Sequence, residues 1–87
     1  ETRNKFYSIS KPIKDSIHKI EKEIKKSEHR VKEIENLMAS EEYYKDSEKV
    51  KKVNAEYSEL KKLLKNLYHD WMKETNKLNK LETELTK

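Results

Sequence analysis

Residue types that carry acid–base and metal chemistry are plentiful in this chain of 87 residues, but their spacing does not favour a site. His18, His29 and His69 have no second histidine three or four residues away, the spacing that places two ligands on one helical face. Most carboxylates lie one turn from a lysine, as Glu21 does from Lys25, and such pairs stabilise a helix. There is no Cys for thiolate ligands and no Gly for a phosphate-binding loop. We therefore predict no catalytic residue, metal site or cofactor here, and no enzymatic activity.

Lysine is the residue type whose abundance suggests a function. Charged residues make up 44% of the chain and the net charge is +4, which favours anionic partners mildly. Two interpretations are open: a basic surface that contacts phosphates, and the ordinary solvated face of a Lys-rich helix. If the first holds, the candidate nucleic-acid-binding residues are the outward lysines Lys19, Lys22, Lys25, Lys26, Lys32, Lys51, Lys52, Lys62, Lys65 and Lys73.

Two apolar seams must position these lysines. Their residues follow one another in alternating steps of three and four, which average 3.5 residues, the period of a coiled coil. Ser27 interrupts the first seam and Glu74 the second. A polar residue in such a core fixes the register or marks a wet layer near an end. The seams are Ile13, Ile17, Ile20, Ile24, Val31, Ile34 and Met38, and Val50, Val53, Tyr57, Leu60, Leu64, Leu67, Trp71, Leu78, Leu81 and Leu85.

The seams predict one helix at about 11–39 and another at about 47–86, joined by a loop at about 40–46. Residues 1–10 are mostly polar and are expected to be a linker or tail from an upstream domain. Pro12 suits the first turn of a helix because the N–H that it lacks has no helical partner there.

The loop between the helices carries its own signals. Asp46 or Ser47 can cap the second helix by accepting a hydrogen bond from a free backbone N–H. Tyr43 and Tyr44 are expected to fold over the open end of the seam. A loop of this length suits antiparallel neighbours.

The predicted fold is all-α: two long helices that form an intramolecular antiparallel coiled-coil hairpin. Two registers are open. One places Ile34 opposite Val50 and pairs Arg30 with Glu56, and the other shifts the helices by one heptad and places Ile34 opposite Tyr57. The flanking charge pairs favour the first.

Apolar residues beside the seams leave two further questions. Leu37, Leu63, Tyr68 and Met72 widen the apolar stripe, so a dimeric four-helix bundle is the alternative to the expected monomer. Trp71 and Tyr68 suggest stacking with unpaired nucleic-acid bases. The seam position of Trp71 favours core packing instead.

The chain is long enough for one small domain. No apolar run has the length of a membrane span, and no hydrophobic segment marks a signal peptide. The chain begins with Glu1 rather than Met, so we expect it to be a piece of a longer protein.

The loop and the end of the second seam resemble the C-terminal coiled-coil domain of the ABC-F ATPases, the bacterial Uup type in particular. In that family an acidic loop bearing an aromatic residue follows the first helix, and the second helix closes with a Tyr-x-x-Trp pattern. The resemblance spans about residues 9–81. The segments that carry it are Leu37-Met38-Ala39-Ser40-Glu41-Glu42-Tyr43-Tyr44, Asp46-Ser47-Glu48-Lys49-Val50 and Tyr68-His69-Asp70-Trp71.

The resemblance implies a soluble cytoplasmic parent protein with two upstream ATP-binding cassettes, which would hold ATP and Mg, working on or near the ribosome. It also implies that this domain binds DNA or ribosomal RNA. Our first hypothesis is therefore a nucleic-acid-binding module that contacts phosphates without reading sequence. The alternative is a structural or protein-interaction arm that touches no nucleic acid.

Overall fold

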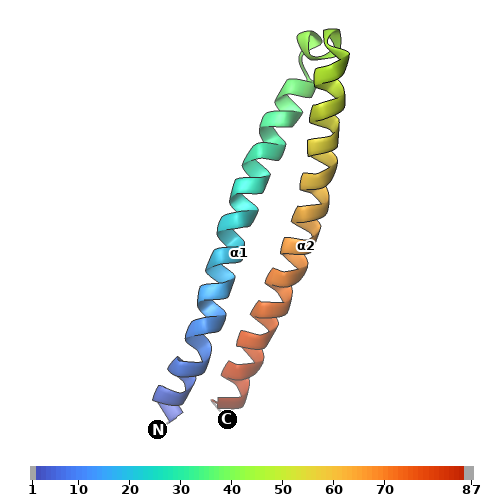
Figure 1. Cartoon of the computed structure of the whole chain (residues 1–87). Coiled ribbons are helices and arrows are strands. Elements are labelled where there is room, and N and C mark those ends of the chain that lie inside the picture. Colours follow the sequence, from blue (N-terminus) through green and yellow to red (C-terminus); the bar gives the residue numbers. More distant parts are fainter. Residues whose placement is uncertain (1, 86–87) are drawn as a thin grey trace.

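The computed structural model describes residues 2–85, with side chains described from residue 5 to residue 84. Helix α1 spans Thr2–Met38, a short 3₁₀ helix η1 spans Glu41–Lys45, and helix α2 spans Ser47–Leu85 (Figure 1). The two long helices lie side by side and antiparallel, in a rod with extents of 65 × 16 × 14 Å. The predicted all-α hairpin is confirmed. Within residues 2–85 no helix has the length and apolar character needed to cross a bilayer.

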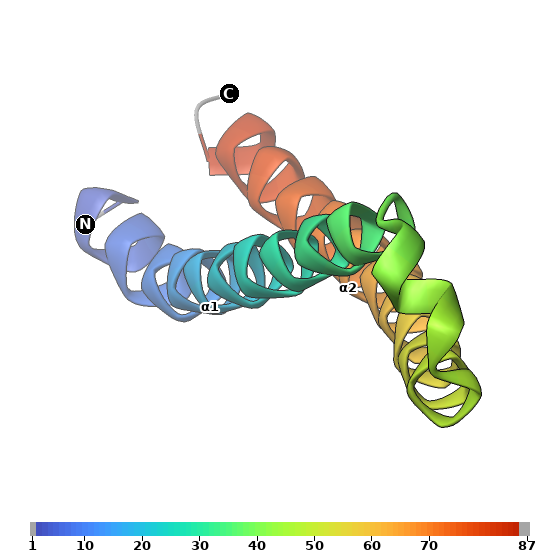
Figure 2. The same cartoon turned by 90° about the horizontal axis from the view of Figure 1, so that it is seen from above.

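Both seams form the core of the hairpin, and α1 and α2 cross at an angle instead of running parallel (Figure 2), as helices packed along a heptad seam do. Every predicted seam residue with a described side chain is buried or half-buried; Leu85 lies outside the described side chains. Ile34 is fully buried. The core contains two clusters, one around Ile24, Val31 and Leu64, and one around Ile34, Tyr43 and Val53.

Helix α1 begins at Thr2, nine residues before the expected start near Lys11, so the predicted start of this helix was wrong. The heptad pattern continues upstream, because Ser10 occupies the next core position and is buried. Pro12 therefore lies inside the helix, where it removes one backbone hydrogen bond. Ser8, whose carbonyl loses that partner, is exposed to solvent. That residues 1–10 connect to an upstream domain stays a prediction.

The turn is closed by one of the two tyrosines that were expected to cover it. Tyr43 is 3% exposed, and its hydroxyl lies 3.2 Å from the carbonyl oxygen of Val50 and 3.0 Å from Oδ1 of Asn54, either of which accepts its proton. Burial raises the pKa of the Tyr43 phenol. The prediction was wrong for Tyr44, which is 64% exposed and whose ring stands nearly perpendicular to the Tyr43 ring, with the ring centroids 5.0 Å apart. Asp46 caps α2 by accepting a hydrogen bond from the backbone N–H of Lys49 at 3.2 Å.

The register is the one that places Ile34 opposite Tyr57. Tyr57 packs against the cluster of Ile34, and its hydroxyl donates to the carboxylate of Glu35 at 3.1 Å. Further from the turn, the indole N–H of Trp71 donates to Glu21 at 3.1 Å. Both bonds join residues that this register brings level with each other.

The preference for the other register was wrong, although the ion pair that suggested it is present. Arg30 donates two hydrogen bonds to Glu56, at 2.7 and 2.8 Å. The guanidinium stands at the end of a long side chain, so the pair tolerates an offset between the helices. It therefore does not distinguish the registers.

The two polar residues of the seams are accommodated differently. Ser27 is 5% exposed and lies between the layers of Ile24 and Val31. The side chain of Glu74 is half-buried, and its carboxylate lies 3.4 Å from the ammonium of Lys77, one turn further along α2. Each polar residue thus lies within the packed interface and leaves the hairpin continuous.

Candidate nucleic-acid interface

All ten lysines predicted to contact phosphates are exposed, but the hairpin does not bring them together on one face. We describe their positions by the heptad, in which a and d face the partner helix, e and g flank the seam, and b, c and f point outward. The b position holds Lys25, Lys32, Lys51 and Lys65, the c position holds Lys19, Lys26, Lys52 and Lys73, and the f position holds Lys22 and Lys62.

Cross-helix contacts show which positions share a broad face of the rod. Glu21, Glu28 and Glu35 occupy successive e positions of α1 and all bond to α2 through aromatic residues. We call the broad face with the e and b positions the aromatic face. Arg30 and Glu56 occupy g positions, and we call the broad face with the g and c positions the Arg30 face.

The aromatic face is held by hydrogen bonds that the sequence analysis missed. The hydroxyl of Tyr68 donates to Glu28 at 2.6 Å, besides the bonds from Trp71 to Glu21 and from Tyr57 to Glu35. The bond to Glu28 raises the pKa of the Tyr68 phenol, because ionisation would remove the proton that the phenol donates. The sequence held a signal for these bonds: on α1 a carboxylate recurs every seven residues beside the seam, and the seam of α2 contains aromatic residues.

Outside these bonded carboxylates, the outer rows of the aromatic face carry no acid. The b positions from Lys11 to Lys32 and from Lys51 to Asn79 contain lysine, histidine and neutral residues only. Lys61, which was not among the predicted contacts, adds an ammonium 5.5 Å from the centroid of the Tyr57 ring. A nucleic-acid backbone that follows the b positions of this face would therefore meet no carboxylate in those rows.

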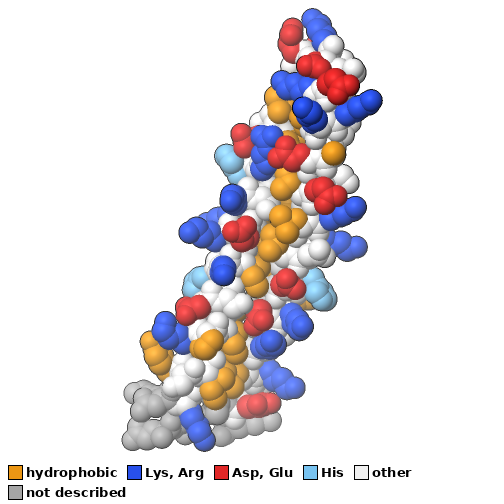
Figure 3. Space-filling model, viewed as in Figure 1, with side chains coloured by type: hydrophobic (Ala, Val, Ile, Leu, Met, Phe, Trp, Pro, Cys, Tyr) orange, Lys and Arg blue, Asp and Glu red, His pale blue; other side chains and the backbone are white. Residues whose placement is uncertain are grey.

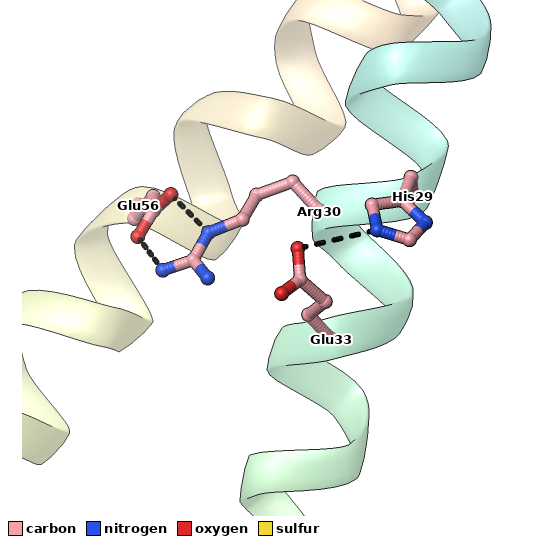
Figure 4. A network of polar contacts seen from close by, with 4 residues as sticks. All are labelled: His29, Arg30, Glu33 and Glu56. Carbon is pink, nitrogen blue, oxygen red and sulfur yellow. Dashed lines mark hydrogen bonds and ion pairs between the residues drawn. The ribbon is translucent and has the colours of Figure 1, made fainter.

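The Arg30 face mixes charges of both signs. Its outer c positions hold Glu33 and Glu59 among the lysines. In Figure 4, Arg30 reaches from α1 to Glu56 on α2, while His29 and Glu33 pair within α1 at 3.7 Å. The bond to Glu56 raises the pKa of Arg30, and the guanidinium lowers the pKa of Glu56. Charges neutralised in this way are less available to a nucleic acid.

A hollow opens between the helices on the aromatic face, and we call it the Trp71 hollow. Its volume is about 570 Å³. Two of the predicted lysines, Lys22 and Lys25, lie on its edge. Trp71 packs against the core as predicted and also lines this hollow, so part of its side chain is accessible from the surface. The lining residues are His18, Glu21, Lys22, Ile24, Lys25, Tyr68 and Trp71.

The space-filling view shows how such surfaces are arranged. In Figure 3, a stripe of hydrophobic side chains follows the groove between the helices, and charged side chains line both of its edges. Across the width of the rod, one apolar stripe thus lies between two charged edges. Among the described residues no group of three or more His, Cys, Asp or Glu side chains could hold a metal ion.

Comparison with known proteins adds one finding. The family model of the ABC transporter C-terminal domain matches residues 10–74, which include most of both helices and the whole turn. No curated protein and no solved structure matches the chain.

Proposed function

Because this chain belongs to the ABC transporter C-terminal domain family, we propose that it is the coiled-coil module of an ABC-F ATP-binding protein of the Uup type and binds nucleic acid. The matched family is a C-terminal domain, so we assign this chain no reaction of its own. ATP and Mg would be held by domains upstream, and no residue described above is assigned to them. DNA and ribosomal RNA are the partners proposed, with a cytoplasmic location.

One observation carries the nucleic-acid proposal: among the described residues, the b positions of the aromatic face present lysines on both helices and hold no carboxylate. Glu21, Glu28 and Glu35 lie between these two rows, and each is bonded to an aromatic residue of α2. Lys25 and Lys32 lie on α1, and Lys51 and Lys65 lie on α2. An ammonium acts as a point charge that neutralises phosphates and releases counterions. Such contacts hold a nucleic acid without reading its sequence.

Salt-dependent titration tests the proposal. If about six phosphates are neutralised, the affinity for DNA or structured RNA falls roughly a thousandfold between 50 and 200 mM salt. The lysines of the two faces can be compared with matched double variants. We expect Lys25→Gln with Lys65→Gln to reduce the slope of log affinity against log salt by about 2, and Lys26→Gln with Lys73→Gln to change it less. An affinity that does not vary with salt, or no binding at low salt, would refute the proposal.

Exposed apolar residues support the second candidate function, a protein-interaction arm. Tyr44 is exposed at the turn, and Leu63 and Met72 are exposed along α2. In that case Lys62→Glu with Lys65→Glu leaves nucleic-acid affinity unchanged. Tyr44→Ala or Met72→Ala would instead weaken association with a protein partner, measured with the full-length parent protein.

A further inference from the structure

We propose that the Trp71 hollow binds one unpaired nucleotide of a nucleic-acid strand, with its base against Tyr68 and Trp71 and its phosphate at Lys22 and Lys25. This inference rests on the proposed function and goes further, because contact with phosphates alone requires no such site. The volume of about 570 Å³ lies within the range of roughly 300–1,000 Å³ that small-molecule sites occupy.

The aromatic walls are oriented before any ligand arrives. The indole N–H of Trp71 is held by Glu21 at 3.1 Å, and the Tyr68 hydroxyl is held by Glu28 at 2.6 Å. Both rings therefore have their polar ends anchored on the opposite helix, while their apolar surface lines the hollow. A ring that is already fixed loses little conformational entropy on binding. Stacking on such rings accepts every base, since each base has a π-face.

The charges at the edge match the other half of a nucleotide. Lys22 and Lys25 are exposed, and neither forms an ion pair with a described residue, so both ammonium groups are available to a phosphate. His18 adds a third basic side chain, 3.6 Å from Glu21. An aromatic wall beside two unpaired ammonium groups is complementary to a flat base joined to an anion.

Glu21 sets the orientation of the nucleotide. Its carboxylate lines the hollow and would repel a phosphate placed there, so the phosphate belongs at the lysines. A carboxylate has about four acceptor positions, and the indole of Trp71 uses one of them. The remaining positions can accept an N–H from the edge of the base. A base inside a duplex has its faces stacked and its edge paired, so only an unpaired nucleotide fits this arrangement.

Three probes of equal length separate base contacts from phosphate contacts in the unmodified chain: an oligothymidylate, the same backbone with abasic sites, and a blunt DNA duplex. Trp71 is the single tryptophan of the chain, so its fluorescence reports the hollow directly. We expect the oligothymidylate to quench this fluorescence saturably and to bind about tenfold more tightly than the abasic strand. The duplex should leave the fluorescence unchanged.

Variants give an independent readout. Tyr68→Leu should lower the affinity for oligothymidylate about tenfold, while Tyr68→Phe, which keeps the ring and loses only the bond to Glu28, should lower it much less. Tyr44→Leu is the matched control, because Tyr44 is exposed and lies at the turn, outside the hollow. Circular dichroism verifies that each variant is folded.

Two results overturn the inference, and they are distinguishable. Equal affinity for the oligothymidylate and the abasic strand, without quenching but with steep salt dependence, removes the nucleotide site and leaves the proposed function in place. No binding of any probe at low salt removes both.

Discussion

Three carboxylates of α1 hold the aromatic residues of α2 by their polar ends. Tyr57, Tyr68 and Trp71 each have a large apolar ring and one N–H or O–H donor, which suits a position at the edge of a core. Tyr57 and Trp71 pack into the core clusters, and all three donors reach a carboxylate at the surface. These side chains therefore bury apolar area without burying an unpaired polar group.

The Tyr68–Glu28 bond makes the stability of the hairpin decrease with rising pH in the alkaline range. The folded-state pKa of Tyr68 lies above its ordinary value of 10.0, so the bond stabilises the fold fully below about pH 10. This contribution is lost as the pH rises through the folded-state pKa. In urea unfolding from pH 8 to pH 11, we expect the wild-type chain to lose more stability than Tyr68→Phe. Parallel curves for the two chains would contradict this.

Ile34 is the most buried hydrophobic residue of the core. It is 0% exposed and packs between Tyr43 and Val53. We expect Ile34→Ala to reduce the free energy of unfolding by about 2–5 kcal/mol, because the truncation leaves a cavity. Ile9→Ala, at a residue 46% exposed, should cost about 0.5 kcal/mol or less. Denaturant titration measures both, and equal losses would show that the core is not where the structure places it.

At the scale of helices, α1 and α2 depend on each other. The β-branched residues of the α1 seam have modest helix propensity, so packing supplies most of the stability of this helix. The turn reinforces the pairing, because Tyr43 in η1 reaches the first turns of α2 through Val50 and Asn54. A helix pair closed in this way should unfold as one unit.

The Arg30–Glu56 pair gives this helix pair an acid dependence. The guanidinium lowers the pKa of Glu56 below its ordinary value of 4.5, so the pair stabilises the fold above about pH 4.5. Its contribution is lost as the pH falls through the lowered pKa. We expect Glu56→Gln to flatten the decrease in stability between pH 5 and pH 2, measured by thermal unfolding. Glu59→Gln, on a carboxylate 3.9 Å from Lys62, is the control and should leave the decrease almost unchanged.

For the molecule as a whole, the exposed apolar residues do not form one surface. Tyr68 and Met72 lie on the aromatic face, whereas Leu63 lies at a g position on the Arg30 face. A stable dimer needs a continuous apolar patch, which this arrangement does not provide. The exposed apolar residues are therefore divided between two narrow faces of the rod, and neither face offers a packing surface for a further helix.

We accordingly expect the chain to be a monomer. Sedimentation equilibrium should give a mass of 10.6 kDa, and Leu63→Lys with Met72→Lys should leave that mass unchanged. A mass twice as large that falls to 10.6 kDa in the double variant would instead establish the four-helix bundle.

Much of the fold could be predicted because its signals are local. The 3.5-residue period of the seams, the short connection and the cap at Asp46 each depend on a few neighbouring residues. The start of α1 was missed because Pro12 is a local signal for a helix start, whereas the heptad continues upstream to Ser10, which is buried. Tyr43 and Tyr44 are adjacent and of the same type, so only the path of η1 decided which one is buried.

Apolar periodicity shows which side of a helix is buried, so the amino-acid pattern alone predicts that two helices pair along apolar seams and that the lysines stay outside. The register, the bonds from Glu21, Glu28 and Glu35 to aromatic residues, and the division of the lysines between two faces became visible only in the folded hairpin. These features depend on how far one helix slides along the other. Flanking pairs contribute only tenths of a kcal/mol to that choice, so packing along the whole interface settles it.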